Sequence, residues 1–439
     1  MANTKKKQQI TKGNRITKGN TKYRTKKRNI KQNIKQNTKQ NSKNYYLVKS
    51  AYFNNHIINN AFKIRTNWEK YNVNKPQKVS PDFLYLDGLS ISNKNYWKYK
   101  PSLQNKFDAT SSNLTSKDTL YQTLNDNKDK YPVLNKYMIN NINIDFKEFI
   151  INDKNDKNDK KINYSKIDKF QKYFSNPDNN KKPKQWIFKP IGGYQGKGIV
   201  VVSDFQTFKK KCEEILNFLI KDVENLIKKE IGRGYQSLKL YNRWVLQEYI
   251  DKTLLYPNIT SGKKIHLRVY FLYFNDTIKK QINGYILDTC HLGMAKEKYK
   301  HNDYNNKDIH DTHLGKNKKG LTFPYDFKKI MSPGQIKNIF QQLKELFSIL
   351  KELFQSSCYP GIKNCYEILG ADIIILPDYS IKLIEVNSNL NIINNPLEKA
   401  NTHSKLFNGL MSLVVDKVFP PLQKDLKNIK TIPNHFIEV

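Results

Sequence analysis

The chain has 439 residues, of which 38% are hydrophobic and 12% aromatic, so it is long enough to bury the cores of two or three domains. Its formal net charge of +38 favours acidic partners, which include nucleic acid, an anionic membrane surface and an acidic protein tail. No apolar run approaches the roughly eighteen residues of a membrane-spanning helix, so we expect no such segment.

The cysteines and the amino-terminal sequence bear on the compartment. Cys212, Cys290, Cys358 and Cys365 lack the spacing of a metal site, and nothing resembles a signal peptide. We therefore expect a cytoplasmic chain whose thiols are reduced.

Residues 1–44 differ from the rest of the chain. They hold fifteen Lys and Arg and no acid, and they repeat the strings ITKGN and KQN, so we expect a disordered basic arm. Nucleic acid is a conceivable partner of this arm alone. Codon bias in an AT-rich genome is an equally good explanation of its Lys and Asn content. The remaining chain keeps a net charge of +23, because the arm accounts for fifteen of the +38.

An N-terminal lobe is expected over residues 45–150. It includes a helix that starts near residue 114, with Thr115 or Ser116 as its N-cap. Residues 151–183 contain the low-complexity run NDKNDKNDKK and are expected to be a linker or an insertion. The other elements expected in the lobe are a strand at 45–48, a helix at 56–62 and a strand at 83–86.

A glycine-rich hairpin follows. Strands are expected at residues 186–190 and 199–203, and the glycine-rich loop 191–198 lies between them. Its backbone N–H groups could bind phosphates, with Lys189 and Lys197 adding positive charge. The loop is neither a P-loop nor a dinucleotide-binding fingerprint, because no helix follows it at once. An ordinary glycine turn remains the alternative.

Three amphipathic helices are expected to cover the sheets, at residues 205–231, 332–357 and 400–418; the last would close on the strand that carries the metal ligands. A buried strand at residues 243–250 runs into a loop, a place where an adenine base is often held between two lobes.

The strand expected at residues 263–274 has three cationic or titratable side chains at period two. Lys264, His266 and Arg268 share one face, and apolar residues occupy the other. We expect the polar face to line a cleft; the alternative is a solvent-facing side of the strand. The polar stretch 299–320 contains His301, His310 and His313, but neither cysteines nor regular spacing support a zinc site there.

Two buried strands form a hairpin near the carboxyl end. The apolar runs 371–376 and 381–386 are separated by Pro377-Asp378. Asp372 lies inside the first run, and Glu385 and Asn387 end the second. Buried carboxylates need a cation, and Mg²⁺ held beside nucleotide phosphates suits them. Pairing of the two carboxylates with nearby lysines is the alternative.

These segments resemble a known family in their order and spacing. WIFKP, QEYI, KKIHLRVYF and EILGADIIIL with LIEVN are similar to motifs of the tubulin–tyrosine ligase-like family of ATP-grasp ligases. The resemblance covers residues 184–420 and extends more weakly back to 45. It implies an α+β class, an ATP-grasp fold with an N-terminal α/β lobe behind the basic arm. The implied lobes are 184–250 (central) and 251–425 (C-terminal, with the metal site), followed by a tail at 426–439.

The resemblance also implies site residues. The catalytic set would be Arg268, Lys264, His266 and Lys117, and the Mg²⁺ ligands would be Asp372, Glu385 and Asn387. The ATP-binding set would be Lys189, Gln195, Gly196, Lys197, Gly198, Gln247, Glu248, Tyr249, Ile250, Lys264 and His313.

The sequence departs from the family pattern at four positions. His266 replaces an aspartate, Gly315 and Lys316 replace the threonine and asparagine of the HLTN segment, and Gly293 stands where an arginine is expected. In the family these positions bear on the incoming amino acid and the acyl phosphate rather than on Mg-ATP.

The implied activity is an ATP- and Mg²⁺-dependent carboxylate–amine ligase. It would add an amino acid, glutamate first, to the acidic tail of tubulin or a similar protein through an acyl phosphate, in the cytoplasm and in association with the cytoskeleton. A membrane partner is not expected. Tyrosine ligase-type activity, a non-catalytic nucleotide- or tubulin-binding role, and nucleic-acid binding through the arm are the alternatives.

Overall fold

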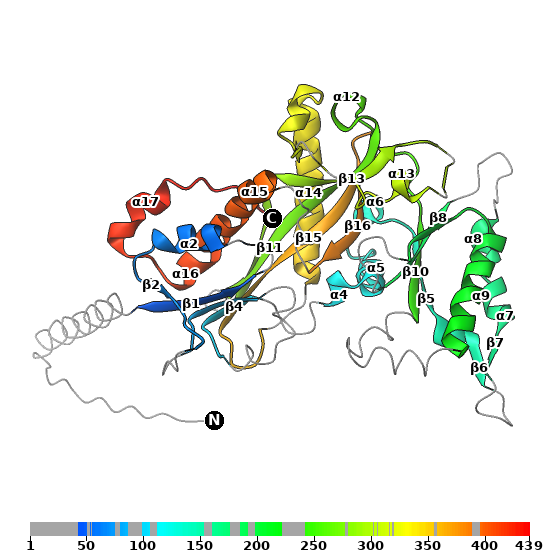
Figure 1. Ribbon diagram of the computed structural model, residues 1–439, viewed down its shortest axis with the longest axis horizontal. Helices are drawn as coiled ribbons and strands as arrows, with labels where there is room; N and C mark the ends of the chain where they lie inside the picture. Colours follow the sequence, from blue (N-terminus) through cyan, green and yellow to red (C-terminus); the bar gives the residue numbers. More distant parts are fainter. Residues whose placement is uncertain are drawn as a thin grey trace, which may run out of the picture.

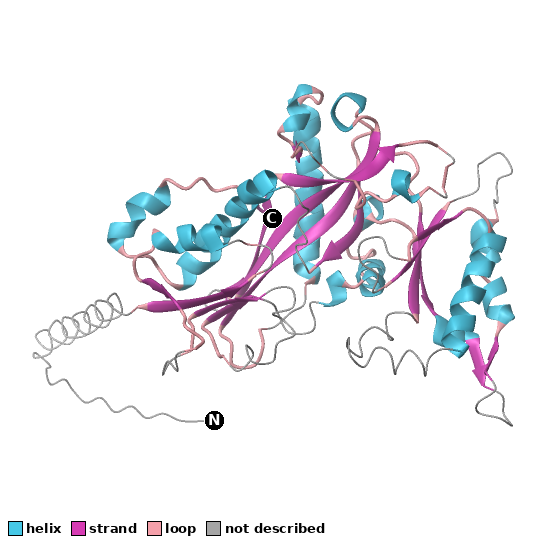
Figure 2. Cartoon of the chain, viewed as in Figure 1, coloured by secondary structure: helices cyan, strands magenta, loops and turns pink. Residues whose placement is uncertain are grey.

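The fold is described from a computed structural model of the chain, shown in Figures 1 and 2. Residues 1–42, which hold almost all of the expected basic arm, lie outside the described part. The described residues are 43–50, 53, 55–74, 80–86, 99–105, 112–152, 160–175, 185–191, 198–221, 242–276, 280–301, 303–304, 306–315, 317, 320–354, 358–388 and 396–439.

In the described part of the chain, a large mixed sheet of eleven strands forms the centre of the molecule (Figure 2). Its main path runs β14-β13-β11-β15-β4-β3-β1-β2; β12 pairs with β11 and β17, and β16 pairs with β15. The strands are β1 (Asn44–Lys49), β2 (Trp68–Lys70), β3 (Phe83–Leu86), β4 (Leu103–Asn105), β11 (Lys263–Asp276), β12 (Gln281–Leu287), β13 (Cys290–Lys298), β14 (Thr322–Phe323), β15 (Asn364–Ile375), β16 (Ile381–Asn387) and β17 (Phe436–Glu438).

Two helical layers cover this sheet, because β11 is apolar on both faces in its second half. Phe271 and Tyr273 pack in the core that includes α14 (Pro333–Leu353), whereas Leu272 and Phe274 pack in the core that includes α15 (Pro396–Leu410). Helix α14 begins as its sequence predicts, with a capping box formed by Ser332 and Gln335. The helices on the α15 side are α2 (Asn55–Lys63), a π-helical turn (Met411–Val415) and α16 (Asp416–Val418).

A smaller antiparallel sheet lies at the right of Figure 1. Its order is β5 (Asn141–Asp145), β10 (Arg243–Glu248), β8 (Trp186–Pro190) and β9 (Val200–Val202). Its core is rich in aromatic residues and is closed by α9 (Phe205–Lys221). The helix was predicted to continue to residue 231, but residues 222–241 lie outside the described part of the chain.

Strand pairing groups the chain differently from the boundaries expected at residues 150 and 183. Strand β5 pairs with β10, and the hairpin of β6 (Ile150–Asn152) and β7 (Lys160–Ile162) spans the low-complexity run and contributes to the core of the smaller sheet. The run therefore lies between two paired strands, as the insertion that was the alternative to a linker would. The other lobe boundaries stay predictions.

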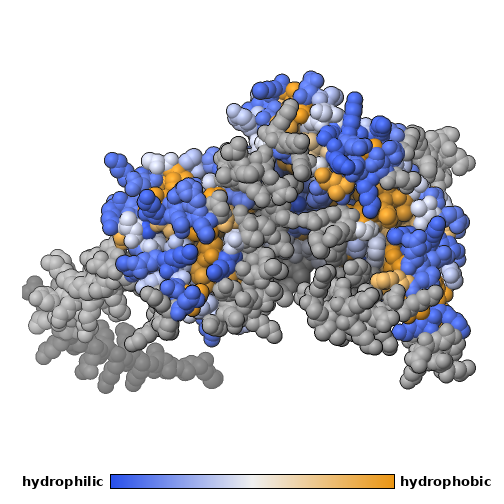
Figure 3. All heavy atoms as spheres, in the orientation of Figure 1, coloured by the Kyte–Doolittle hydropathy of each residue, from blue (hydrophilic) through white to orange (hydrophobic). Residues whose placement is uncertain are grey.

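The remaining helices are short connections. They are α4 (Ser112–Thr115), α5 (Lys117–Asp126), α6 (Leu134–Tyr137), α7 (Tyr164–Asp168), α8 (Gln171–Phe174), α12 (Pro257–Thr260), α13 (Lys307–His310) and α17 (Leu426–Lys430). Within the described ranges, no helix combines the length and apolarity needed to cross a bilayer. In the view of Figure 3, hydrophilic side chains cover much of the described surface, with smaller hydrophobic patches between them.

A buried ion pair joins the two ends of the sequence on the α15 side of the large sheet. Arg65 is 1% exposed, and its Nε and Nη2 atoms each lie 2.7 Å from a carboxylate oxygen of Asp416. Its Nη1 atom donates to the carbonyl of Ala61 at the end of α2. The pair therefore fixes α2 against α16.

The expectation that all four cysteines are reduced thiols was wrong for two of them. Cys358 and Cys365 form a disulfide, with Cα atoms 5.5 Å apart. The chain turns back between them at Gly361, whose φ of +84° suits glycine, and so brings the two side chains together before β15. Cys212 and Cys290 are free and buried.

Candidate active site

A cavity of about 390 Å³ opens between the two sheets. Strands β8, β9 and β10 of the smaller sheet line one side, and β11, β15, β16 and the segment after α13 line the other. It brings together many of the predicted site residues, namely Lys189, Gln247, Glu248, Tyr249, Ile250, Lys264, His313, Asp372 and Glu385.

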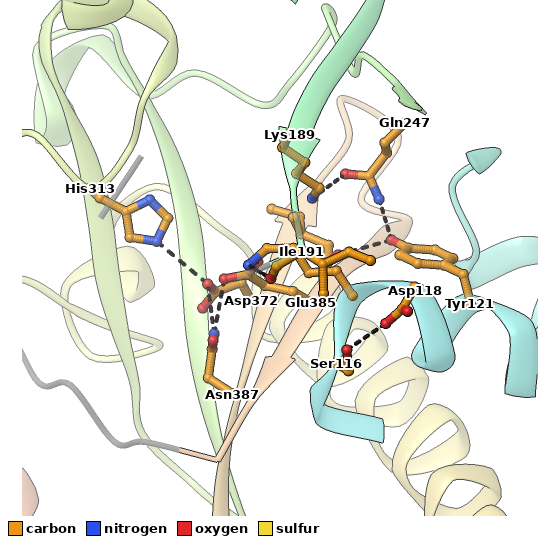
Figure 4. Close-up of polar contacts among 12 residues, drawn as sticks. Ser116, Asp118, Tyr121, Lys189, Ile191, Gln247, His313, Asp372, Glu385 and Asn387 are labelled. Atoms are coloured by element: carbon orange, nitrogen blue, oxygen red, sulfur yellow. Dashed lines mark hydrogen bonds and ion pairs between the residues drawn. The ribbon is translucent and has the colours of Figure 1, made fainter. Parts of the chain in front are cut away.

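Two carboxylates face each other on the predicted hairpin. Asp372 on β15 pairs in register with Glu385 on β16, and Asp372 is only 1% exposed. Asn387 lies beside both, and its Nδ2 atom is 3.0 Å from Glu385 Oε1 and 3.4 Å from Asp372 Oδ2 (Figure 4). The hairpin and its convergence of oxygen-bearing side chains are as predicted.

Arginine and lysine offset this negative charge. Arg268 lies opposite Asp372 in the ladder, and its Nε and Nη2 atoms lie 2.5 and 3.1 Å from the two carboxylate oxygens. Burial alone would raise the pKa of Asp372, but Arg268 and the neighbouring imidazoles hold it well below its usual value. Lys117 Nζ lies 3.4 Å from Glu385 Oε2. Burial likewise opposes ionisation of Glu385, yet Lys117 and other cations lower its pKa to about 2.

Helix α5 carries Lys117 into the site because it is anchored to both sheets. Asp118 accepts from Arg243 of β10 at 2.6 Å. On the other side, the hydroxyl of Tyr121 reaches the backbone carbonyls of Leu383 and Ile384 on β16, at 2.8 and 2.9 Å. The sequence located this helix, but it gave no sign that Tyr121 belongs to the site.

A buried hydrogen-bond chain runs from Tyr121 to Lys189 (Figure 4). Lys189 Nζ donates to Gln247 Oε1 at 2.9 Å, and Gln247 Nε2 donates to the Tyr121 hydroxyl at 2.5 Å. Burial lowers the pKa of Lys189 to about 8, although the carboxylate of Glu385 opposes the shift. The amide of Gln247 thereby orients the ammonium group at the cavity wall.

A second buried lysine, Lys264, also lines the cavity. Lys264 Nζ donates to the carbonyl of Ile250 at 2.8 Å and lies 3.9 Å from the ring centre of Tyr249. Burial lowers its pKa to about 7, with Asp251 opposing the shift. The hydroxyl of Tyr249 is bound in turn to His310 Nδ1 at 2.6 Å.

The three polar side chains of β11 are buried, so the solvent-facing alternative for this strand was wrong. Lys264, His266 and Arg268 are 3%, 2% and 8% exposed, and the apolar residues of the opposite face pack in the core. His266 Nδ1 lies 2.6 Å from Thr312 Oγ1, and its Nε2 atom lies 3.4 Å from Asp372 Oδ1. Burial lowers the pKa of His266.

His313 approaches the same carboxylate from the segment after α13. Its Nδ1 atom lies 3.0 Å from Asp311 Oδ1, and its Nε2 atom lies 3.7 Å from Asp372 Oδ2. Burial would lower the pKa of His313, but Asp311 and Asp372 outweigh it and raise the pKa to about 10. Thr312 and Asp311 were not predicted, because no sequence pattern marks them.

The remaining predicted residues belong to the glycine-rich loop and to the histidines of residues 299–320. Gly198 has a φ of +78° and adjoins Pro190. Gln195, Gly196 and Lys197 lie outside the described residues. Of the three histidines of residues 299–320, His301 pairs with Asp251 and His310 with Tyr249, and His313 lies beside Asp372.

The oxygens of the hairpin fit a hard cation. Asp372 and Glu385 supply carboxylate oxygens, and the amide of Asn387 already lies between them. The oxygen and nitrogen of an Asn amide have nearly the same shape, so rotating this amide by 180° would present Oδ1 in place of Nδ2. These residues are therefore suited to hold Mg²⁺.

Comparison with known proteins identifies the family. A profile described as the tubulin-tyrosine ligase family matches residues 105–426, which is most of the chain. The chain belongs to the tubulin-tyrosine ligase family. The resemblance inferred from the four motifs is confirmed, and no curated protein sequence matches the chain significantly.

A solved structure supports the fold. The C-terminal domain of Pby1 from K. lactis, described as an ATP-grasp enzyme interacting with the mRNA decapping enzyme Dcp2, matches with a TM-score of 0.56 and 20% sequence identity. The match covers 90% of this chain and 98% of that chain. The predicted α+β, ATP-grasp fold is confirmed, and membership of this ligase family supports an ATP-dependent ligase-type enzyme.

Proposed function

We propose that this tubulin-tyrosine ligase family member uses ATP and Mg²⁺ to join an amino acid, glutamate first, to a carboxylate of an acidic protein tail such as that of tubulin. The observation that carries the proposal is the set of buried cations around the paired carboxylates. Lys189, Lys264 and Arg268 are each less than 10% exposed. Lys189 and Lys264 line the cavity between the sheets, and Arg268 binds Asp372, which also lines it. Such a set suits a substrate with several negative charges.

Each group has a role in the proposed reaction. The acceptor carboxylate attacks the γ-phosphorus of ATP, the bond to the bridging oxygen breaks, and ADP leaves. Lys189 and Arg268 stabilise the charge on the transferring phosphoryl group. Mg²⁺ on Asp372, Glu385 and Asn387 would neutralise phosphate charge. The amine of the free amino acid then attacks the acyl carbon, and inorganic phosphate leaves as the amide forms.

The remaining positive charge suits an acidic acceptor. The chain carries +38 overall, so a glutamate-rich tail would be steered to it over long distances, and the attraction would weaken with salt. On this proposal the protein works in the cytoplasm and associates with the cytoskeleton through tubulin. The proposal includes no membrane partner, and it leaves nucleic acid only to the basic arm.

A second candidate function rests on two glycines. A Cβ atom at Gly293 would lie 1.9 Å from His266, and one at Gly315 would lie 2.3 Å from the carbonyl of Ala295. The larger family side chains cannot be placed there without local change. A protein that binds nucleotide and tubulin without ligation is therefore the competing proposal, and tyrosine as the added amino acid is the competing donor.

Ligation of labelled amino acids tests these proposals. The purified full chain is incubated with ATP, Mg²⁺ and tubulin, and each of the twenty labelled amino acids is added in a separate reaction. We expect label from glutamate in tubulin, and none with Glu385→Gln. Glu297→Gln, which changes an exposed carboxylate on β13, is the matched control and should label normally. Label from tyrosine alone would show that tyrosine, not glutamate, is the added amino acid. ATP binding without label from any amino acid would favour the non-catalytic function.

A further inference from the structure

Two histidines and one aspartate meet beside the cavity, which His313 and Asp372 line. His266 comes from β11, His313 from the segment after α13, and Asp372 from β15. One ligand atom from each lies within 4.8 Å of the other two. Two imidazoles and a carboxylate form a common donor set for divalent transition metals, whereas Mg²⁺ prefers oxygen donors alone.

The two rings are oriented as metal-ligating histidines are. Both Nε2 atoms face Asp372, at 3.4 Å for His266 and 3.7 Å for His313. Both Nδ1 atoms are held from behind, by Thr312 Oγ1 at 2.6 Å and by Asp311 Oδ1 at 3.0 Å. A second partner on the far ring nitrogen fixes the ring and its tautomer, and metal-binding histidines nearly always have one.

The distances also suit an ion better than direct hydrogen bonds. A charged N–H···O bond is about 2.7–2.9 Å long, which is shorter than either Nε2 contact with Asp372. Zinc bonds of about 2.1 Å at tetrahedral angles separate two donor atoms by about 3.4 Å. The His266 contact with Asp372 Oδ1 matches that separation, and the His313 contact with Oδ2 is 0.3 Å longer, at 3.7 Å against 3.4 Å, so an ion would draw the three donors together from within 4.8 Å of one another. Figure 4 shows the ring of His313 directed at Asp372.

The carboxylate of Asp372 can accept a further partner beside Arg268. Arg268 binds both oxygens of Asp372, but an ionised carboxylate offers about four lone-pair positions, so Oδ1 keeps one beside His266, and the second position of Oδ2 faces Asn387 Nδ2 at 3.4 Å. The backbone is also shaped around the first histidine, because only glycine at position 293 leaves room for the His266 ring. The glycine at position 293 thus makes room for one of the two imidazoles of the cluster.

We propose that His266, His313 and Asp372 bind one divalent transition-metal ion of the Zn²⁺, Co²⁺ or Mn²⁺ class. This site adjoins the Mg²⁺ ligands Glu385 and Asn387 and shares Asp372 with them. It needs neither nucleotide nor acceptor, so it does not depend on the proposed ligation.

Cobalt provides the direct test. The full chain is stripped of metal with a chelator and titrated with Co²⁺ in the absence of ATP, while the visible d–d absorption is followed. We expect one Co²⁺ per chain, displaced by one equivalent of Zn²⁺ but not by millimolar Mg²⁺. His313→Gln and His266→Asn should each weaken binding by about 100-fold or more. Elemental analysis of the untreated protein should then find a transition metal.

Controls keep the outcomes separate. His435→Gln changes a partly exposed histidine that pairs with Asp288, and it should bind Co²⁺ like the parent chain. His313 has a side chain 32% exposed, so its variant should fold even if His266→Asn does not, and thermal unfolding checks both. Absence of a d–d band, or equal binding by parent and His313→Gln, would overturn the proposal. Either result leaves ligation to its own assay.

Discussion

Gly293 lies directly opposite His266 in the β11–β13 ladder, and a Cβ atom built on Gly293 would lie 1.9 Å from Cε1 of the imidazole. The two positions are also departures from the family pattern, which has an arginine and an aspartate there. They therefore form one structural change rather than two, because the ring occupies the space that any side chain at 293 would need.

This contact predicts strong coupling between the two positions. Gly293→Ala should destabilise the protein by about 1–3 kcal/mol through overpacking. The same substitution in a His266→Ala background should cost much less, since the ring is gone. Urea unfolding of the four proteins in the cycle measures the coupling. Strictly additive effects would show that the ring moves aside freely.

Burial of Lys264 predicts a pH-dependent stability. Its pKa is about 7 in the folded chain, against about 10.4 for an unperturbed lysine, so between these values the unfolded chain holds a proton that the folded chain lacks. Stability of the parent relative to Lys264→Met should therefore rise with pH across this window, by up to about 1.4 kcal/mol per unit. Urea unfolding at pH 7.5, 8.5 and 9.5 tests it.

The matched control is Lys427→Met, which removes an exposed lysine from α17. The difference in unfolding free energy between parent and variant should change much more steeply with pH for Lys264→Met than for Lys427→Met. Equal slopes would mean that Lys264 keeps an ordinary affinity for its proton in the folded state.

The ion pair between α2 and α16 predicts a large effect on stability. Asp416→Asn leaves the guanidinium of Arg65 buried without its countercharge, which should cost about 3–5 kcal/mol. The control is Asp168→Asn. The side chain of Asp168 is 49% exposed, so loss of its pair with Lys209 should cost less than about 1 kcal/mol. Denaturant midpoints of the two variants separate these cases; similar midpoints would contradict the buried pairing.

The hydroxyl of Tyr121 predicts a link between folding and nucleotide binding. Tyr121→Phe removes the acceptor for Gln247 and the donor to β16, so it should destabilise the chain by about 1–3 kcal/mol. It should also weaken ATP binding, because Gln247 orients Lys189. Calorimetric titration with ATP measures this effect. Tyr131→Phe, which removes a hydroxyl bonded to Glu352 and Lys130 and away from Gln247, should bind ATP like the parent.

Local patterns in the sequence were sufficient to predict several parts of the site. The turn at Pro377-Asp378 and the period of two predicted that Asp372, Glu385 and Asn387 converge, and the structure confirms it. Alternation likewise assigned the two faces of β11. Both predictions depend on residues within one strand or one hairpin, where spacing alone determines which side chains share a face.

Contacts between distant segments could not be predicted in this way. The approach of Tyr121 to β16 depends on how α5 crosses the sheet, and the pairing of β5 with β10 joins segments separated by the whole glycine-rich region. The Cys358–Cys365 disulfide depends on a turn whose geometry the sequence did not reveal. The period of hydrophobic residues shows which face of a helix or strand is buried, but it does not show which other helix or strand packs against that face.

The parallel pairing of β4 with β15 has a consequence for synthesis. Leu103 pairs with Asn364, so a chain growing on the ribosome exposes one edge of β4 until residue 364 and its neighbours have emerged. Unpaired strand edges promote association between chains, and pairing across such a separation is slow to form. Nascent chains halted before β15 should therefore depend on chaperones to remain unaggregated, whereas complete chains can bury that edge themselves.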